Sequence, residues 1–235
     1  MTTPSLERAN RHFIDARVRW ADVDVELARQ TPRVLDLLRE ACLVEAYLPV
    51  FLGRMMAIFW DDIDATSSFT IEAIEAHVHF EVLRRYLEKV GHRPLSDAEI
   101  VAVRRRGRRA VSSDPIRELV NFMGTEHFAA YFFATLAQDA VEPVLKDVLR
   151  EFSAEEEVHS RFALDLLAER LARDPGLLPA IVEHARSFRH VGTYALGPLT
   201  AVREDDIAPI QALNRKYEEL LGRRLSDYLV GDANR

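Results

Sequence analysis

Apolar residues recur at three- and four-residue steps along most of the chain, which is the spacing that brings side chains to one face of an α-helix. On one long predicted helix this face is interrupted by Glu156 and His159. Its apolar members are Leu149, Phe152, Ala163, Leu166 and Leu167. A carboxylate and an imidazole on a core face are costly to bury unless another group binds them. We therefore expect Glu156 and His159 to have a common binding partner.

Three other predicted helices also bring acids or imidazoles to their apolar faces. These residues are Glu45 on the first helix, Glu72, Glu75 and His79 on the second, and Glu126 on the third. Glu45 and Glu75 are 30 residues apart. Glu126 on the third helix and Glu156 on the fourth are also 30 residues apart. The repeat predicts two related helix pairs.

Carboxylates and imidazoles without thiolates suit iron, manganese or zinc better than Cu(I). Helical bundles bind pairs of such metal ions with acids and histidines from four facing helices. A single acid on an apolar face usually lies at the edge of the core, and a single histidine usually makes a hydrogen bond there. The combination on four helices in order is more specific, and it predicts a metal centre.

Helix boundaries follow from capping residues, prolines and glycines. The helix of Glu45 begins at Thr31-Pro32, and Pro49 predicts a kink within it. Further helices are expected over residues 67–90, 115–138, 143–173, 177–189 and 207–221, with another beginning at the capping box of residues 96–99. No stretch has the alternation of a β-strand. The sequence predicts one all-α domain over residues 1–235, with a four-helix core at about 32–173 and peripheral helices around it.

Composition narrows the function classes. The 235 residues are 48% hydrophobic and 29% charged, which is an ordinary globular balance, and the formal net charge is −7. An acidic chain is a poor general ligand for nucleic acid. Cys42 is the sole cysteine, which excludes a disulfide framework and a cysteine metal site. The first residues have no apolar core of a secretory signal, and no apolar stretch is long enough to span a membrane. We expect a cytoplasmic protein with no nucleic-acid or membrane partner.

Five arginines follow one another closely in this acidic chain. They are Arg104, Arg105, Arg106, Arg108 and Arg109. Basic residues stabilise the carboxyl end of a helix through its dipole, so the cluster has a structural interpretation. It can also dock an acidic partner or a phosphate.

Four segments carry a family resemblance. They are Glu45-Ala46-Tyr47-Leu48-Pro49, Glu75-Ala76-His77-Val78-His79, Thr125-Glu126 and Glu155-Glu156-Glu157-Val158-His159. They resemble the metal-binding segments of the ferritin-like di-iron carboxylate superfamily, and most closely those of the soluble acyl-carrier-protein desaturases. The resemblance covers roughly residues 32 to 195 and implies a ferritin-like four-helix bundle.

The resemblance also implies a site and an activity. Six residues would bind two iron ions, or manganese: Glu45, Glu75, His79, Glu126, Glu156 and His159. Glu155 would orient a histidine, and Glu72 is a reserve ligand. The implied activity is an O₂-dependent oxidase or oxygenase that uses electrons from a donor such as ferredoxin. Its substrate would be an acyl chain or another apolar molecule, which an acyl carrier protein docked on the arginine cluster could deliver, and the family analogy indicates a homodimer.

The chain departs from the family pattern at two places. Three residues before His79 the family has a ligand acid, whereas this chain has Ala76. Either Glu75 replaces that ligand with the help of a π-bulge, or the site has one ligand fewer. The family's Arg-Ala-Thr after the third acid is His127-Phe128-Ala129 here, so its threonine is absent. Hydroxylation, N-oxygenation and aldehyde deformylation therefore remain alternatives to desaturation, as does a non-catalytic metal-binding or structural bundle.

Overall fold

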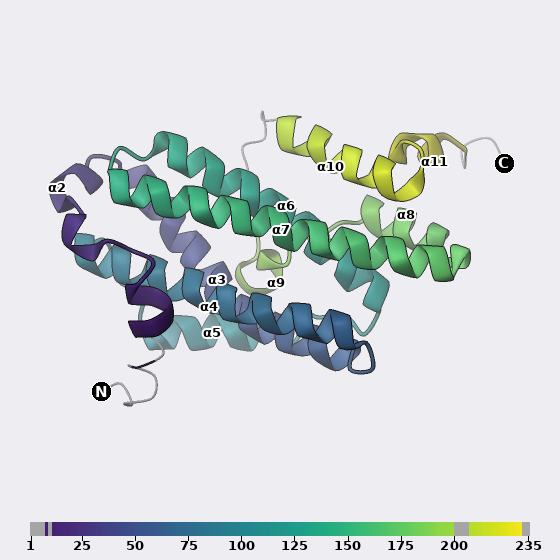
Figure 1. Ribbon diagram of the computed structural model, residues 1–235, viewed down its shortest axis with the longest axis horizontal. Helices are drawn as coiled ribbons and strands as arrows, with labels where there is room; N and C mark the ends of the chain where they lie inside the picture. The colour runs from purple at the N-terminus through teal and green to yellow at the C-terminus, as the bar shows by residue number, and fades with distance from the viewer. Residues whose placement is uncertain (1–7, 9–10, 200–206, 232–235) are drawn as a thin grey trace.

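The computed structural model describes residue 8 and residues 11–199 and 207–231, and over these residues the chain is helical without a β-strand (Figure 1). The all-α prediction is confirmed for this part of the chain. Four long helices form its centre: α3 (Pro32–Ile58), α4 (Ile63–Val90), α6 (Pro115–Asp139) and α7 (Pro143–Arg173). The shorter elements are η1 (Arg11–Asp15), η2 (Trp20–Asp22), α2 (Val25–Ala28), α5 (Asp97–Gly107), η3 (Pro175–Leu177), α8 (Leu178–Arg186), α9 (Gly192–Leu196), α10 (Ile207–Leu221) and α11 (Leu225–Gly231).

The four long helices pair as two hairpins, α3 with α4 and α6 with α7. Packing is closest within each hairpin, and the contacts between hairpins are fewer, including those between α4 and α7. Figure 1 shows α4 and α7 running across the middle of the molecule, with α10 and α11 beyond α7 and α5 beyond α4. The two hairpins correspond to the helix pairs that the 30-residue spacing predicts.

Local signals set the ends of these helices. Asp114 and Glu142 cap α6 and α7 through backbone N–H groups, and each is followed by proline at the first helical position. Gly91 ends α4 in the left-handed conformation at φ 69°. The start of α4 differs from the prediction, because the carboxylate of Asp62 accepts a hydrogen bond from the N–H of Ala65 and caps the helix four residues earlier than expected.

Helix α3 continues through Pro49 to Ile58. The proline has no N–H to donate to the carbonyl of Glu45, four residues earlier. Helix α5 packs beside this point: the Arg104 guanidinium donates to the Ala46 carbonyl at 2.7 Å, and the Tyr47 hydroxyl donates to the Gly107 carbonyl at 3.0 Å. Helix α5 therefore supports the segment of α3 that carries Glu45.

The buried apolar residues form two clusters along the long helices. On α3 the first cluster extends to Ala46 and the second begins at Tyr47. On α7 the first cluster includes Phe152 and the second includes Ala163. Buried acids and histidines gather around this boundary: Glu45, Glu72, His79, Glu126, Glu156 and His159. A polar layer thus lies between two apolar regions.

Among the described helices, α3 alone has the length and apolar composition of a membrane span, contrary to the expectation that no apolar stretch is long enough. Its most apolar window has a mean hydropathy of 1.5, and 56% of that window is buried inside the protein. Because Glu45 also lies on the buried face of α3, we interpret α3 as a core helix.

Candidate metal centre

Six buried carboxylate and imidazole side chains from the four long helices converge in two groups. The first group is Glu45, His79 and Glu156, and the second is Glu72, Glu126 and His159. In each group one ligand atom from every residue lies within 4.8 Å of the others. Each group contains one imidazole and two carboxylates, and its three members come from three different helices. None of the six residues is more than 6% exposed.

Glu156 joins the two groups. Its Oε1 lies 2.9 Å from Nδ1 of His79, and its Oε2 lies 3.0 Å from Nδ1 of His159. Oε2 of Glu45 lies 3.7 Å from the same Nδ1 of His79. One carboxylate therefore presents an oxygen to each imidazole, which is the position of a ligand shared by two metal ions.

Many polar atoms of these side chains have no hydrogen-bond partner among the described residues. They are Oε2 of Glu45 and both carboxylate oxygens of Glu72 and of Glu126. Nδ1 of His79 and Oε1 of Glu156 lie close to each other but without the geometry of a hydrogen bond. Leaving a buried polar atom unpaired costs about 1–3 kcal/mol, so a cluster of them is expensive for the fold. Divalent cations would satisfy these atoms together, and the donor set of oxygen and imidazole nitrogen fits iron or manganese.

Burial and mutual repulsion perturb the acids of the site. Burial raises the pKa of Glu45 to about 7 and that of Glu72 to about 8, and it raises the pKa of Glu126 well above its usual range. Burial also opposes ionisation of Glu156, but the hydrogen bond from His159 and the ion pair with His79 outweigh burial and hold the pKa of Glu156 far below its ordinary value. Four carboxylates and two divalent cations would balance in charge, which removes the reason for the raised values.

Each histidine is oriented by an acid on the opposite helix. Nε2 of His79 donates to Glu155 on α7 at 2.7 Å, and Nε2 of His159 donates to Glu75 on α4 at 2.6 Å. Each acid lies four residues before the histidine of its own helix. Histidines that bind metal ions commonly donate their second ring N–H to a carboxylate, which fixes the tautomer. This arrangement leaves Nδ1 of each histidine directed toward the carboxylates of its own group. For Glu155 this agrees with the expected role of orienting a histidine.

The arrangement on α4 differs from the expected one. Helix α4 is a regular α-helix from Ile63 to Val90 and has no π-bulge that would turn Glu75 inward. Glu75, the predicted ligand, contacts His159 from the outside and belongs to neither group, whereas Glu72, the expected reserve ligand, belongs to the second group. Glu72 lies seven residues before His79, two turns along the same face. Ala76 is buried at the place where the family pattern has an acid.

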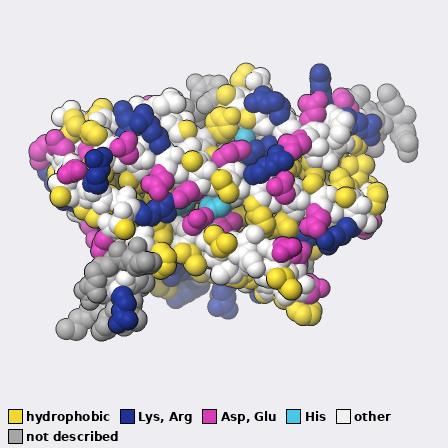
Figure 2. Space-filling model, viewed as in Figure 1, with side chains coloured by type: hydrophobic (Ala, Val, Ile, Leu, Met, Phe, Trp, Pro, Cys, Tyr) yellow, Lys and Arg dark blue, Asp and Glu magenta, His cyan; other side chains and the backbone are white. Residues whose placement is uncertain are grey.

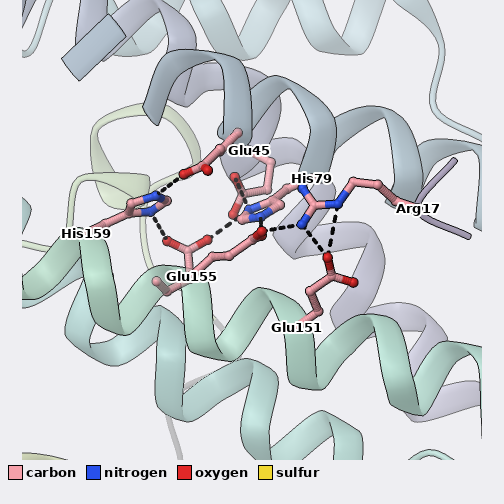
Figure 3. A network of polar contacts seen from close by, with 8 residues as sticks. Arg17, Glu45, His79, Glu151, Glu155 and His159 are labelled. Atoms are coloured by element: carbon pink, nitrogen blue, oxygen red, sulfur yellow. Dashed lines mark hydrogen bonds and ion pairs between the residues drawn. The ribbon is translucent and has the colours of Figure 1, made fainter. Parts of the chain in front are cut away.

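Sequence reasoning missed one residue beside the site. Arg17, between η1 and η2, contacts Glu151 and Glu155 on α7 (Figure 3). Burial raises the pKa of Glu155, but the hydrogen bonds from His79 and Arg17 outweigh burial and keep that pKa below its ordinary value. No periodic pattern surrounds Arg17, and 138 positions separate it from Glu155, so local sequence gives no signal for this contact.

The arginine cluster divides between two environments. Arg104 is partly buried and bonded to α3, and the other four lie exposed at the end of α5 and just after it: Arg105, Arg106, Arg108 and Arg109. Arg104 therefore has a structural contact, whereas the four exposed arginines form a basic surface at the carboxyl end of the helix.

Comparison with known proteins found no family model, no curated protein and no solved structure that matches this chain. We therefore infer the function from the geometry of the two Glu/His groups.

Proposed function

We propose that this protein is a ferritin-like di-iron oxidase or oxygenase, an O₂-dependent oxidoreductase that acts on an acyl chain or another apolar substrate with externally supplied electrons. The observation that carries the proposal is the pair of buried groups, each with one histidine and two carboxylates, that meet at Glu156. The segment resemblance to acyl-carrier-protein desaturases supports the choice of iron and O₂.

The chain's own residues divide the task. Glu45 and His79 would hold one metal ion, the second group would hold the other, and Glu156 would contact both. When bound, two ferrous ions supply the electrons and the binding site with which O₂ can be activated to attack an unactivated C–H bond. The residues around them fix the donors: the bonds from Nε2 of each histidine keep both Nδ1 atoms directed inward.

Apolar side chains keep water away from the His79 group. The ring of Phe152 lies 3.9 Å from that of His79 between centroids, and the ring of Phe133 lies 6.3 Å away. Electrostatic interactions strengthen in such a dry environment, and reactive species are protected from water. This packing supports oxidative chemistry over simple metal storage.

The test is metal content after anaerobic reconstitution with Fe²⁺, followed by exposure to O₂ with optical detection. We expect two iron ions per chain and a transient absorbance. One iron per chain would replace the di-iron proposal with a mononuclear one. Two irons without any reaction with O₂ would leave a metal-binding bundle and reject the enzyme. Product analysis with candidate substrates then separates desaturation from hydroxylation, N-oxygenation and deformylation.

The exposed arginines after α5 are the proposed dock for an acidic acyl carrier protein. Replacing Arg105 and Arg109 together by glutamate should weaken carrier binding, most strongly at low ionic strength, because salt screens exposed charges. Replacing the exposed Arg54 on α3, which is outside the arginine cluster, by glutamate offers a charge-reversal control. Equal carrier affinity in the two variants and the parent protein would reject the docking surface.

A further inference from the structure

The chain before α3 packs against the long helices beside the candidate site. Ile14, Val18 and Val23 are buried in the first apolar cluster. Polar side chains between them contact α4 and α7: Asp15 pairs with Arg85 of α4, and Arg19 lies 3.4 Å from Asp147 of α7. Residues 14–23 therefore bridge α4 and α7, two helices that make few contacts with each other.

Arg17 points from this segment toward the site (Figure 3). Its Nη2 donates to Glu151 at 2.5 Å and also to Glu155, and its Nε lies 3.1 Å from Glu151. Oε1 of Glu155 receives Arg17, and Oε2 receives Nε2 of His79. A continuous chain of contacts thus runs from Arg17 through Glu155 to the imidazole.

Among the described residues, the His159 side has no equivalent of Arg17. Glu75 accepts from Nε2 of His159, but no arginine or lysine contacts Glu75 in the described part of the chain. The side chain of Glu75 is 33% exposed, compared with 21% for Glu155. Glu155 and Glu75 therefore both accept a hydrogen bond from a histidine, but their surroundings differ. A guanidinium contacts Glu155, whereas Glu75 is partly exposed to solvent.

We propose that Arg17 is a positioning residue for the metal site of His79, which it serves by fixing the rotamer of Glu155. The inference rests on the proposed function, because it requires metal ions at the two groups. A guanidinium has several donors in a rigid plane and can engage Glu151 and Glu155 at once. A fixed Glu155 holds the N–H of Nε2 and so directs Nδ1 of His79 toward the metal.

The experiment is an anaerobic titration of the full chain with Co²⁺, a spectroscopic substitute for Fe²⁺, in which visible absorbance reports each equivalent bound. Arg17→Ala should weaken one of the two equivalents by about 10-fold or more, the usual cost of losing a group that orients a ligand. Arg19→Ala is the matched control, because it removes a contact from the same segment to the same helix without touching Glu155. This control should bind both equivalents as the parent does.

Two single-site backgrounds assign the weakened equivalent. Glu126→Ala leaves the group of Glu45 and His79, and Glu45→Ala leaves the group of His159. Arg17→Ala should lower Co²⁺ affinity in the first background and leave it unchanged in the second. Equal loss in both backgrounds would overturn the proposal, because it would mean that Arg17 supports only the fold.

A double-mutant cycle tests whether Arg17 acts through Glu155. Glu155→Ala should weaken the same equivalent, and adding Arg17→Ala to it should cause no further loss. Arg17→Lys should recover part of the affinity, since it restores a cation but not the planar fork. Additive losses would overturn the proposal even if Arg17→Ala alone folds poorly. A parent protein that binds no Co²⁺ or Fe²⁺ would instead reject the proposed function itself, and the role of Arg17 with it.

Discussion

The two halves of the candidate centre use the same residue types in different surroundings. His79 is fully buried, packed against Phe152, and oriented by a carboxylate that Arg17 holds. His159 is 6% exposed and is oriented by Glu75, which faces solvent. Figure 2 shows histidine surface among acidic side chains between α4 and α7. The outer acid of one half is therefore covered by the chain before α3, and the outer acid of the other half is partly exposed to solvent.

The halves also differ in how a helix supplies its acids. On α7 the adjacent residues Glu155 and Glu156 take the outer and inner roles, four and three residues before His159, respectively. On α4 the outer acid is again four residues before the histidine, but the inner acid lies seven residues before it. One turn and two turns along a helix reach nearly the same face, so the same site can be built from unequal spacings.

The largest expected effect comes from removing the residue that both halves share. Glu156→Ala should reduce bound iron from two ions per chain to fewer than one, because each imidazole loses the carboxylate beside its Nδ1. Far-UV circular dichroism should show helical content close to that of the parent. Glu157→Ala, at an exposed neighbouring position, is the matched control. Retention of two irons by Glu156→Ala would refute the shared ligand and with it the pairing of the halves.

A more selective effect separates the inner acid of α4 from the outer one. Glu72→Ala should abolish binding of the ion at the His159 half and leave the His79 half filled. Glu75→Ala should keep both ions and weaken one by about 10-fold, as expected for a group that only orients a ligand. Iron stoichiometry and affinity by anaerobic titration distinguish the two variants.

The double variant Glu72→Ala/Ala76→Glu sharpens the same comparison. It moves the inner acid to three residues before His79, the spacing that α7 uses. We expect it to recover part of the binding lost in Glu72→Ala. The opposite ranking, in which Glu75→Ala loses an ion and Glu72→Ala does not, would restore Glu75 as the ligand.

The sequence predicts some of the buried acids, but it does not distinguish Glu72 from Glu75. Glu45, Glu126 and Glu156 are predictable because each interrupts an apolar face, and helix periodicity alone brings them to the core. Glu72 and Glu75 are three residues apart, and both lie on the face of α4 where polar residues interrupt the apolar pattern. Which of them points inward depends on the rotation of α4 about its axis, and packing against the other helices sets that rotation.

Contacts from outside the long helices were beyond prediction for a different reason. Arg17 lies in a stretch without regular periodicity, and its partner is far away along the chain. The arginine cluster shows the converse: five similar residues in sequence divide into one bonded to a backbone carbonyl and four facing solvent. The sequence shows which residues are charged, but tertiary packing determines which of these charged side chains contact the candidate metal centre.

The smallest effect is the dependence of metal-free stability on pH, to which both halves contribute an acid. Burial raises the pKa of Glu45 to about 7 and that of Glu72 to about 8, against 4.5 for an ordinary glutamate. Between these values the folded protein binds protons that the unfolded chain has already released. The free energy of unfolding therefore falls as the pH rises from about 4.5 to about 8, and the raised pKa values of His79 and His159 extend this fall to higher pH. The lowered pKa of Glu156 acts in the opposite direction, but only below about 4.5.

Thermal melts in the presence of a chelator measure this dependence. We expect the metal-free parent to melt at a higher temperature at pH 5 than at pH 8, and saturating Mn²⁺ to stabilise it more at pH 8, because metal binding displaces the retained protons. Glu45→Gln and Glu72→Gln keep the size of the side chain but cannot ionise, so each should flatten the metal-free profile in part. If one variant removes the whole pH dependence of the melting temperature and the other removes none of it, only one of the two acids retains its proton in the folded protein. The two halves would then differ in the pKa of their buried acid.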